Sequence, residues 1–313
     1  MKQAHYLYII LIVFLFSVTG RAQSLVLTPK WTAQAQFAGY YVADRMGFYK
    51  DEELDVHIEH PSTSESSFSL LQSGKSQVVV MNLSFALTTC ADGAQLVNIM
   101  QTSQENSLIL VSHSPLHGAA SLQGKKIAIW NHLSEDLLGR IAGHNNLNIE
   151  WIRFNSGVNL FLSKAVDICL VGSYNEFPQL EECGMQMDST HIFRLAAHGY
   201  NVPEDGLYVT KDFYNRHPDL IKKLVRASIK GWEWASEHRE KTLDIVMDIV
   251  RQNNIGTNRY HQRKMLEEIL RLQIDQSKGE RTYHLSREGF DCAVRNLLND
   301  AEKEKIPYHE FVK

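Results

Sequence analysis

The stretch KWTAQAQFAGYYVADRMGFYKDEELDVHIEH, residues 30–60, decides the fold expected for this chain. It joins a Trp on a polar segment to an aromatic cluster and a short helix, which we expect to stop at Gly47. An apolar pair and acidic residues then lead to a predicted strand over Leu54–Ile58. A strand end, a helix N-terminus and aromatic rings together offer unpaired N–H groups and stacking faces. This combination predicts a binding site for a flat polar ligand.

The residues around this stretch alternate between short apolar runs and helical patterns. We expect strands at 25–28, 77–81 and 96–100 and helices at 64–73 and 85–91. Such alternation predicts a parallel sheet covered by helices. Ligands bind beyond the carboxyl ends of the strands in these sheets. Trp31 and Asn82 each follow a strand, so we expect both at the same rim.

A second series of strands and helices predicts a second lobe. It begins near Leu122 and ends near Leu195. We expect the chain to cross between the lobes twice, at Val111–Pro115 and at Pro203–Tyr208, which makes a hinge. The expected division is lobe 1 at 23–112 and 208–313 and lobe 2 at 113–207.

The chain after the second crossing is predicted to be helical. We expect helices at 218–237, 240–252, 260–272 and 286–302. Pro218 suits the first turn of the first of them, and residues 306–313 are expected to pack loosely or fray. The predicted fold class is α/β, a bilobed arrangement of two mixed, mostly parallel sheets flanked by helices, with further helices at the C-terminus.

The N-terminus has the pattern of an export signal. Lys2 precedes the apolar run Tyr6–Val18, and the small residues Gly20 and Ala22 suggest cleavage after Ala22, which makes residues 1–22 a signal peptide. The apolar run is short for a bilayer span, although an uncleaved anchor is the alternative. We therefore expect a periplasmic or otherwise exported protein.

Composition and charge narrow the function classes. The hydrophobic share of 44% leaves room for a real core. Without Lys2 and Arg21 the 32 basic residues fall to 30 against 36 acidic ones, a net charge of −6. This balance argues against a nucleic-acid partner, which needs a basic face. An exported acidic protein is also a poor match for chemistry with costly cofactors, so we expect none.

The cysteines and histidines give no metal or hydrolase pattern. The four cysteines form no CxxC, and buried thiols are expected, with a Cys169–Cys183 disulfide as the alternative. Two histidine pairs, at 57 and 60 and at 113 and 117, have metal-like spacing but lack a third ligand. No GxSxG nucleophile elbow occurs. We therefore expect neither a metal site nor a hydrolase.

Four side chains are candidates for ligand contact on their own chemistry. Trp31 stands on a polar loop, where it is either a stacking face or a core residue. Tyr40 is expected to face the cleft while Tyr41 packs. Asn82 offers two donors and an acceptor, or else caps the next helix, a role that Ser84 could take instead. Glu176 follows a buried strand and could accept bonds from a ligand amine or form an interlobe salt bridge.

Several segments together resemble one protein family. They are Trp31 with QFAGYYVA at 36–43, GFYK at 47–50, LDV at 54–56, LQSGK at 71–75, LQGKK at 122–126, YNE at 174–176, and PDL through KGW at 218–232. The chain resembles the substrate-binding proteins of ABC importers for nitrate, sulfonates and thiamine precursors, together with the fungal thiamine-pyrimidine synthases. The resemblance runs from residue 25 to about 250. It implies the bilobed periplasmic-binding-protein fold of type 2.

Within that family, the opening is similar to members that bind the pyrimidine precursor of thiamine. The resemblance implies ligand contacts from Trp31, Gln36, Tyr40, Asn82, Tyr174, Asn175 and Glu176, to which the strand-end position adds Ser84. Typical pyrimidine binders carry a His before the helix, where this chain has QAQFAGYY. Similar openings also occur in sensor domains of signalling kinases, which leaves a receptor role open.

The synthase branch can be tested on the sequence. The synthases' active-site Lys and His correspond to Met81 and Phe85, and their cysteine-rich motif corresponds to HGYNVPED at 198–205, which has no cysteine. Without the lysine, pyridoxal phosphate cannot form its Schiff base. We therefore predict a non-enzymatic, monomeric solute-binding protein that captures a thiamine pyrimidine precursor and delivers it to an ABC permease. A sulfonate or nitrate binder is the alternative ligand class.

Overall fold

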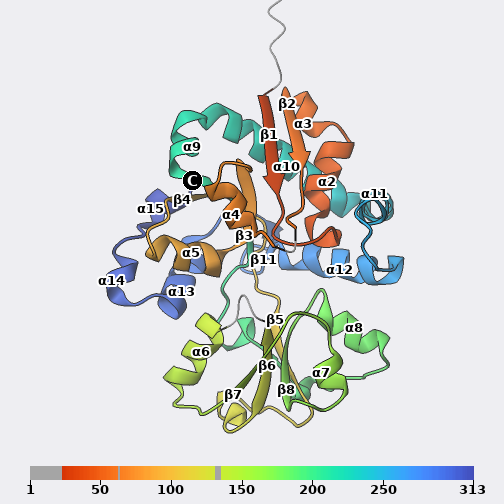
Figure 1. Cartoon of the computed structure of the whole chain (residues 1–313), viewed down its shortest axis with the longest axis vertical. Helices are drawn as coiled ribbons and strands as arrows, with labels where there is room; N and C mark the ends of the chain where they lie inside the picture. Colours follow the sequence, from red (N-terminus) through yellow and green to blue (C-terminus); the bar gives the residue numbers. More distant parts are fainter. Residues whose placement is uncertain (1–22, 63, 131–134) are drawn as a thin grey trace, which may run out of the picture.

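The computed structural model describes residues 23–62, 64–130 and 135–313, and the predicted signal peptide at 1–22 lies outside the described residues. The described chain forms two lobes, each built on its own five-stranded sheet with helices packed around it (Figure 1). The predicted α/β class, with two mixed sheets and C-terminal helices, is confirmed. Within the described residues, no helix has the length and apolar character needed to cross a bilayer.

The sheet of lobe 1 has the strand order β2-β1-β3-β10-β4. Its strands are β1 (Gln23–Thr28), β2 (Leu54–Ile58), β3 (Val78–Asn82), β4 (Leu96–Gln101) and β10 (Asp205–Thr210). β1 runs parallel to β2 and β3, whereas β10 returns from lobe 2 and lies antiparallel between β3 and β4. The connecting helices are η1 (Ala35–Phe37), α2 (Ala38–Arg45), α3 (Phe48–Asp51), α4 (Ser67–Gln72) and α5 (Leu83–Ala91).

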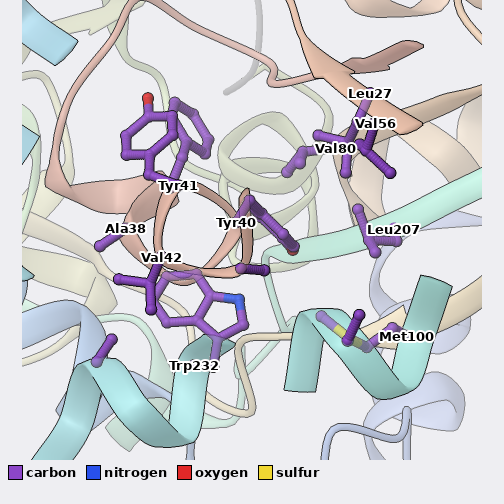
Figure 2. Close-up of a cluster of buried hydrophobic side chains, with 14 of the residues drawn as sticks. Leu27, Ala38, Tyr40, Tyr41, Val42, Val56, Val80, Met100, Leu207 and Trp232 are labelled. Atoms are coloured by element: carbon purple, nitrogen blue, oxygen red, sulfur yellow. The ribbon is translucent and has the colours of Figure 1, made fainter. Parts of the chain in front are cut away.

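Two glycines of the stretch 30–60 allow backbone arrangements that other residues would oppose: the end of α2 and its close packing on a later helix. Gly47 has φ +78°, a left-handed conformation that ends α2. A Cβ on Gly39 would lie 2.1 Å from Trp232 Cδ2, so only glycine lets α2 approach α10 (Pro218–Glu237) this closely. Figure 2 shows Trp232 packed beneath α2, with Tyr40 and Tyr41 leaving the helix toward different sides.

The sheet of lobe 2 has the order β7-β6-β8-β5-β9. Its strands are β5 (Leu108–Ser112), β6 (Lys126–Trp130), β7 (Glu150–Phe154), β8 (Ile168–Gly172) and β9 (Ile192–Arg194). β6 is parallel to β7 and β8, and β5 is antiparallel to β8 and β9. The helical segments of this lobe are η2 (Ala119–Leu122), α6 (Glu135–His144), α7 (Asn159–Leu162), α8 (Glu176–Glu182), η3 (Ser189–His191) and η4 (Ala196–His198).

The first crossing between the sheets comes earlier than predicted. β5 was expected at the end of lobe 1, before a crossing at Val111–Pro115, but it pairs with β8 and β9 in the second sheet. The chain therefore leaves the first sheet between β4 and β5, at 102–107, and returns between η4 and β10, at 199–204. A short apolar strand fits either sheet equally well, because its sequence does not specify its partner.

The C-terminal third belongs to lobe 1, and its last residues are packed more closely than predicted. Its elements are α9 (Lys211–Arg216), α10, α11 (Arg239–Gln252), α12 (Arg259–Leu272), β11 (Ile274–Asp275), β12 (Glu280–Arg281), α13 (Arg287–Leu297), α14 (Asp300–Lys303) and α15 (Tyr308–Phe311). The expected helix at 286–302 is broken, because Asn299 caps a new helix, α14. The expectation of loose packing at 306–313 is wrong. Phe311 is buried, and Lys313 N donates to Asn98 O at 3.0 Å.

Two helices of lobe 1 reach the second lobe. On one side, Phe290 and Leu297 of α13 belong to the same apolar cluster as Leu138 and Ile141 of α6. On the other side, α12 faces α8 through polar side chains, and His261 Nδ1 donates to Glu182 Oε1 at 2.9 Å. Figure 1 places these two contacts on opposite sides of the crossings. Lobe 2 is thus held by an apolar contact and a polar one.

Candidate functional site

Three polar side chains meet where β1, β3 and β10 end or begin. Asn82 closes β3 and lies opposite Asp205, the first residue of β10. Lys30, on the loop after β1, donates from Nζ to Asn82 Oδ1 and lies 2.5 Å from Asp205 Oδ1. The carboxyl ends of β1 and β3 thus form one rim, as the sequence predicts. The returning strand adds a carboxylate to it.

A chain of amide groups extends this rim toward α2. Gln34 Nε2 donates to Gln36 Oε1 at 2.6 Å, and Gln36 Nε2 donates to Asp205 Oδ2 at 2.7 Å. All three side chains are buried. Buried polar groups need such partners, because an unsatisfied one costs about 1–3 kcal/mol. Gln36, a predicted site residue, is therefore part of the rim.

Lobe 2 contributes Tyr174, which follows β8 and packs against the core of lobe 1. This packing brings Tyr174 across the boundary between the lobes, close enough for the carboxyl groups of Glu204 and Asp205 to act on its hydroxyl. Burial raises the pKa of the Tyr174 hydroxyl well above its usual value, and the nearby carboxyl groups of Glu204 and Asp205 raise it further. The hydroxyl therefore stays protonated. Of the predicted site residues in lobe 2, Tyr174 packs against the core of lobe 1.

Glu204 places a second acid beside Asp205 in the return crossing. Burial is the main cause that raises the pKa of Glu204 to about 7, and the charge of Asp205 adds to it. The charge of Lys30 and hydrogen bonds with Ser107 act in the opposite direction. Near neutral pH this carboxyl group is therefore close to half protonated, so it can both donate and accept a hydrogen bond.

Glu176 and Asn175 form a separate bonded unit at the start of α8. Glu176 Oε2 accepts from Gly172 N at 3.0 Å, and Glu176 Oε1 accepts from Asn175 Nδ2 at 3.0 Å. Burial raises the pKa of the Glu176 carboxyl, and these bonds partly offset the effect. The interlobe contact that was the alternative role for Glu176 is made by Glu182 instead, which accepts from His261.

Aromatic side chains stand close in sequence to the rim residues of lobe 1, and Trp130 ends a strand of lobe 2. The Trp31 side chain is 46% exposed, and its carbonyl accepts from His60 Nδ1 at 2.6 Å. Phe85, in the first turn of α5, is also exposed and meets Phe68 edge to face at 5.8 Å between ring centroids. In lobe 2, Trp130 ends β6 with its ring near Gly172. Trp31 is therefore not a core residue, and its role as a stacking face stays a prediction.

Tyr40 is the predicted site residue that the structure places elsewhere. It is 1% exposed, its ring meets Trp232 edge to face at 5.5 Å, and its hydroxyl lies 2.8 Å from Thr102 Oγ1 (Figure 2). Tyr41 is buried as well, and its hydroxyl donates to His60 Nε2 at 2.8 Å. The expectation of a cleft-facing Tyr40 is therefore wrong, because both neighbours turn into the core.

Asn82 and Ser84 also differ from the predicted capping roles. Asn82 occupies the N-cap position of α5, but its side chain makes no capping bond and accepts from Lys30 instead. Ser84 lies inside the helix, in its first turn, so it is not a cap. It is half-buried and sits between Asn82 and the exposed Phe85.

Sequence reasoning missed three charged members of the rim: Lys30, Glu204 and Asp205. Lys30 directly precedes Trp31 after a strand, which could have marked it. The two acids stand in the predicted second crossing, but their partner Lys30 is remote in sequence. Only the antiparallel return of β10 beside β3 brings them together.

The described residues contain no group of three or more His, Cys, Asp or Glu side chains able to hold a metal ion. All four cysteines are free, so the alternative Cys169–Cys183 pair is not formed. Cys169 is buried, and burial raises the pKa of its thiol to about 12. The thiol is therefore an apolar packing group rather than a nucleophile.

Comparison with known proteins adds three findings. The model of the NMT1/THI5-like family matches residues 34–242, two thirds of the chain. Riboflavin-binding protein RibY of Chloroflexus aurantiacus is 23% identical over 260 residues, covering 79% of this chain and 72% of that protein. The formylaminopyrimidine-binding protein of Halalkalibacterium halodurans is 19% identical over 228 residues, covering 69% and 68%.

Solved structures share the fold at low identity. The periplasmic aliphatic sulphonate-binding protein SsuA of Escherichia coli superposes with a TM-score of 0.66 at 12% identity, covering 93% of this chain and 97% of that one. An ABC transporter structure from Parabacteroides distasonis gives a TM-score of 0.59 at 13% identity, covering 94% and 99%. These matches support the bilobed periplasmic-binding-protein fold expected from the sequence.

Proposed function

Because the chain belongs to the NMT1/THI5-like family, we propose that it is the exported substrate-binding protein of an ABC importer. It captures a small uncharged heteroaromatic solute between its lobes and hands it to a membrane permease. A thiamine pyrimidine precursor is the favoured solute. The division into two lobes joined by the crossings at 102–107 and 199–204 supports this function, since such lobes can close on a ligand.

The observation that carries the proposal is the packing of Tyr174, from lobe 2, against the core of lobe 1. The carboxyl groups of Glu204 and Asp205 act on the Tyr174 hydroxyl, and the exposed Trp31 directly follows Lys30 of the rim in the chain. Flat heteroaromatic rings need this combination, because their faces stack on indole while their edges exchange hydrogen bonds with amides and acids. The names of the two curated relatives, which bind riboflavin and formylaminopyrimidine, support a ring-shaped ligand.

Charge at the rim argues against the sulfonate or nitrate alternative. An anion site needs a cation or backbone N–H groups without another acceptor. Lys30 is the cation of the rim, and Asp205 already lies 2.5 Å from its ammonium group. Glu204 and Glu176 add buried carboxyl groups nearby. An anion placed here would meet more acid than base.

The synthase alternative finds no support in the residues of this site. Met81 stands in β3 at 1% exposure, where the synthases have their lysine, and Phe85 replaces their histidine. Neither side chain can form a Schiff base or move a proton. We therefore propose binding without catalysis.

A binding screen tests the proposal. Purified protein is titrated with hydroxymethylpyrimidine, formylaminopyrimidine, riboflavin, an alkanesulfonate and nitrate by calorimetry and thermal shift. We expect submicromolar affinity for a pyrimidine and no binding of the two anions. Binding of riboflavin and of no other compound would agree with the proposed transport function but would replace the pyrimidine by riboflavin as the ligand. Binding of an anion, with no response to any ring compound, would reject the proposed ligand class.

A further inference from the structure

Lys30 directs its charge into the protein rather than into solvent. Its side chain is 15% exposed, and its ammonium group lies between Asp205 and Asn82. A lysine at such a position is uncommon, because an ammonium group loses hydration there unless it is paired. The ion pair with Asp205 meets this requirement. Both partners are therefore parts of the rim and not of the surface.

The pair also balances a local excess of acid. Asp205 and Glu204 are adjacent in the chain, and both are buried. The charge of Lys30 acts on Glu204 in the direction that favours its ionised form, against burial and Asp205. Without Lys30 the two carboxyl groups would lose this neighbouring cation. The rim would then carry net negative charge at neutral pH.

This charge lies within reach of the space between the lobes. Asp205 accepts from Gln36 at 2.7 Å, and Tyr174 of lobe 2 packs against the core of lobe 1. The carboxyl groups of both Asp205 and Glu204 act on the Tyr174 hydroxyl. A ligand enclosed between Tyr174 and the rim would feel the same charges. Charges about 5 Å apart in such surroundings change affinity more than tenfold.

We propose that Lys30 sets the charge selectivity of the interlobe site, because it neutralises Asp205 and thereby confines the site to uncharged rings. The inference rests on the proposed function and adds a residue and a rule to it. Lys30 does not need to touch the ligand. It acts through Asp205, and it also holds Asn82 by its Oδ1, so that the Nδ2 group of Asn82 is the one left to donate.

The test uses three probes with the same ring and different charge. They are hydroxymethylpyrimidine, its N-methylpyrimidinium derivative, and a pyrimidine carboxylate of similar size, each titrated at about pH 6.5, where Glu204 is mostly protonated in the folded protein. The wild type should prefer the neutral ring. Lys30→Met should raise the affinity for the cation relative to the neutral ring by tenfold or more. Asp205→Asn should do the same for the anion.

The double variant Lys30→Met with Asp205→Asn is the matched control. It removes both charges, so it should return the affinity ratios to those of the wild type, as should Lys30→Arg. A purely structural role would weaken all three probes equally. Ratios that stay within twofold of the wild type in both single variants would overturn the role of Lys30 and leave the proposed function intact. A wild type that binds none of the rings would reject both.

Discussion

Asn175 on lobe 2 and His261 on lobe 1 are joined by a hydrogen bond whose direction is fixed by a third residue. Asn175 Nδ2 donates to Glu176 Oε1, so its Oδ1 faces His261 Nε2 at 3.1 Å. The other ring nitrogen, Nδ1, donates to Glu182 Oε1 at 2.9 Å. Both ring nitrogens thus face acceptor atoms of lobe 2. These bonds connect the candidate site to a polar contact that holds the lobes together.

Replacing His261 should loosen the closed arrangement. His261→Ala removes the contacts with Glu182 and Asn175, and a hydrogen bond to a charged group such as the Glu182 carboxylate is worth about 1.5–3 kcal/mol. We expect the radius of gyration of the ligand-free protein to rise in small-angle scattering, and ligand affinity to fall about tenfold. Arg263→Ala on the same helix is the control, since Arg263 pairs with Glu240 within lobe 1. Equal scattering curves for both variants would mean that this contact does not hold the lobes.

Trp31 should contribute to binding without contributing to folding. Because its ring is 46% exposed, Trp31→Ala should change the free energy of unfolding by less than about 0.5 kcal/mol. Loss of the stacking face should weaken ligand binding by tenfold or more. Tyr260→Ala removes a ring of similar exposure, 52%, from α12 and should leave affinity unchanged. Unchanged affinity in Trp31→Ala would remove Trp31 from the site.

Tyr40 should behave in the opposite way. Tyr40→Phe removes the bond to Thr102 Oγ1 from the core and should cost about 0.5–1.5 kcal/mol of stability in chemical denaturation. Ligand affinity should stay the same, because the ring remains in place against Trp232. Tyr49→Phe, which loses a comparable buried bond to Ser228, is the reference for the size of the loss. A selective loss of affinity in Tyr40→Phe would return Tyr40 to the ligand site.

The raised pKa of Glu204 should make stability depend on pH. The folded protein holds this proton up to about pH 7, whereas the unfolded chain releases it near pH 4.5. Between these values the folded state binds more protons, so the free energy of unfolding should fall as pH rises, by at most about 3 kcal/mol. Glu204→Gln should remove this part of the decline. Parallel pH profiles for the two proteins, measured by urea denaturation, would contradict the burial of this carboxyl group.

The contact of α2 with α10 should tolerate no side chain at Gly39. A Cβ there would overlap Trp232, so Gly39→Ala should lower the free energy of unfolding by about 3 kcal/mol or more. Gly143→Ala in α6 meets nothing within 4 Å and should be neutral or stabilising. Thermal denaturation compares the two. A Gly39→Ala variant as stable as Gly143→Ala would show that the helices can move apart at little cost.

The parts of the fold that sequence predicted are those set by local pattern. The strand over Leu54–Ile58, the stop at Gly47 and the helix from Pro218 follow from periodicity and from residues with special backbone preferences. The sheet to which β5 belongs could not be predicted, because strand pairing depends on distant partners. The burial of Tyr40 could likewise not be predicted, because its ring packs against Trp232, a residue remote in sequence.

The positions of single candidate residues could be predicted where one residue type was enough. Trp31 lies on the loop after β1 and Asn82 at the end of β3, as expected, whereas their contact with a ligand stays a prediction. The charged pair was missed because neither Lys30 nor Asp205 is unusual by itself. Their pairing follows from the return of β10 beside β3, a feature of the whole topology.

The measurement that tests the account most directly is a calorimetric titration of the wild-type protein with hydroxymethylpyrimidine, alongside an alkanesulfonate of similar size. The account predicts submicromolar binding of the neutral ring, a tenfold or greater loss in Trp31→Ala, and no heat from the sulfonate. Tight binding of the sulfonate with no response to the pyrimidine or to riboflavin would contradict it.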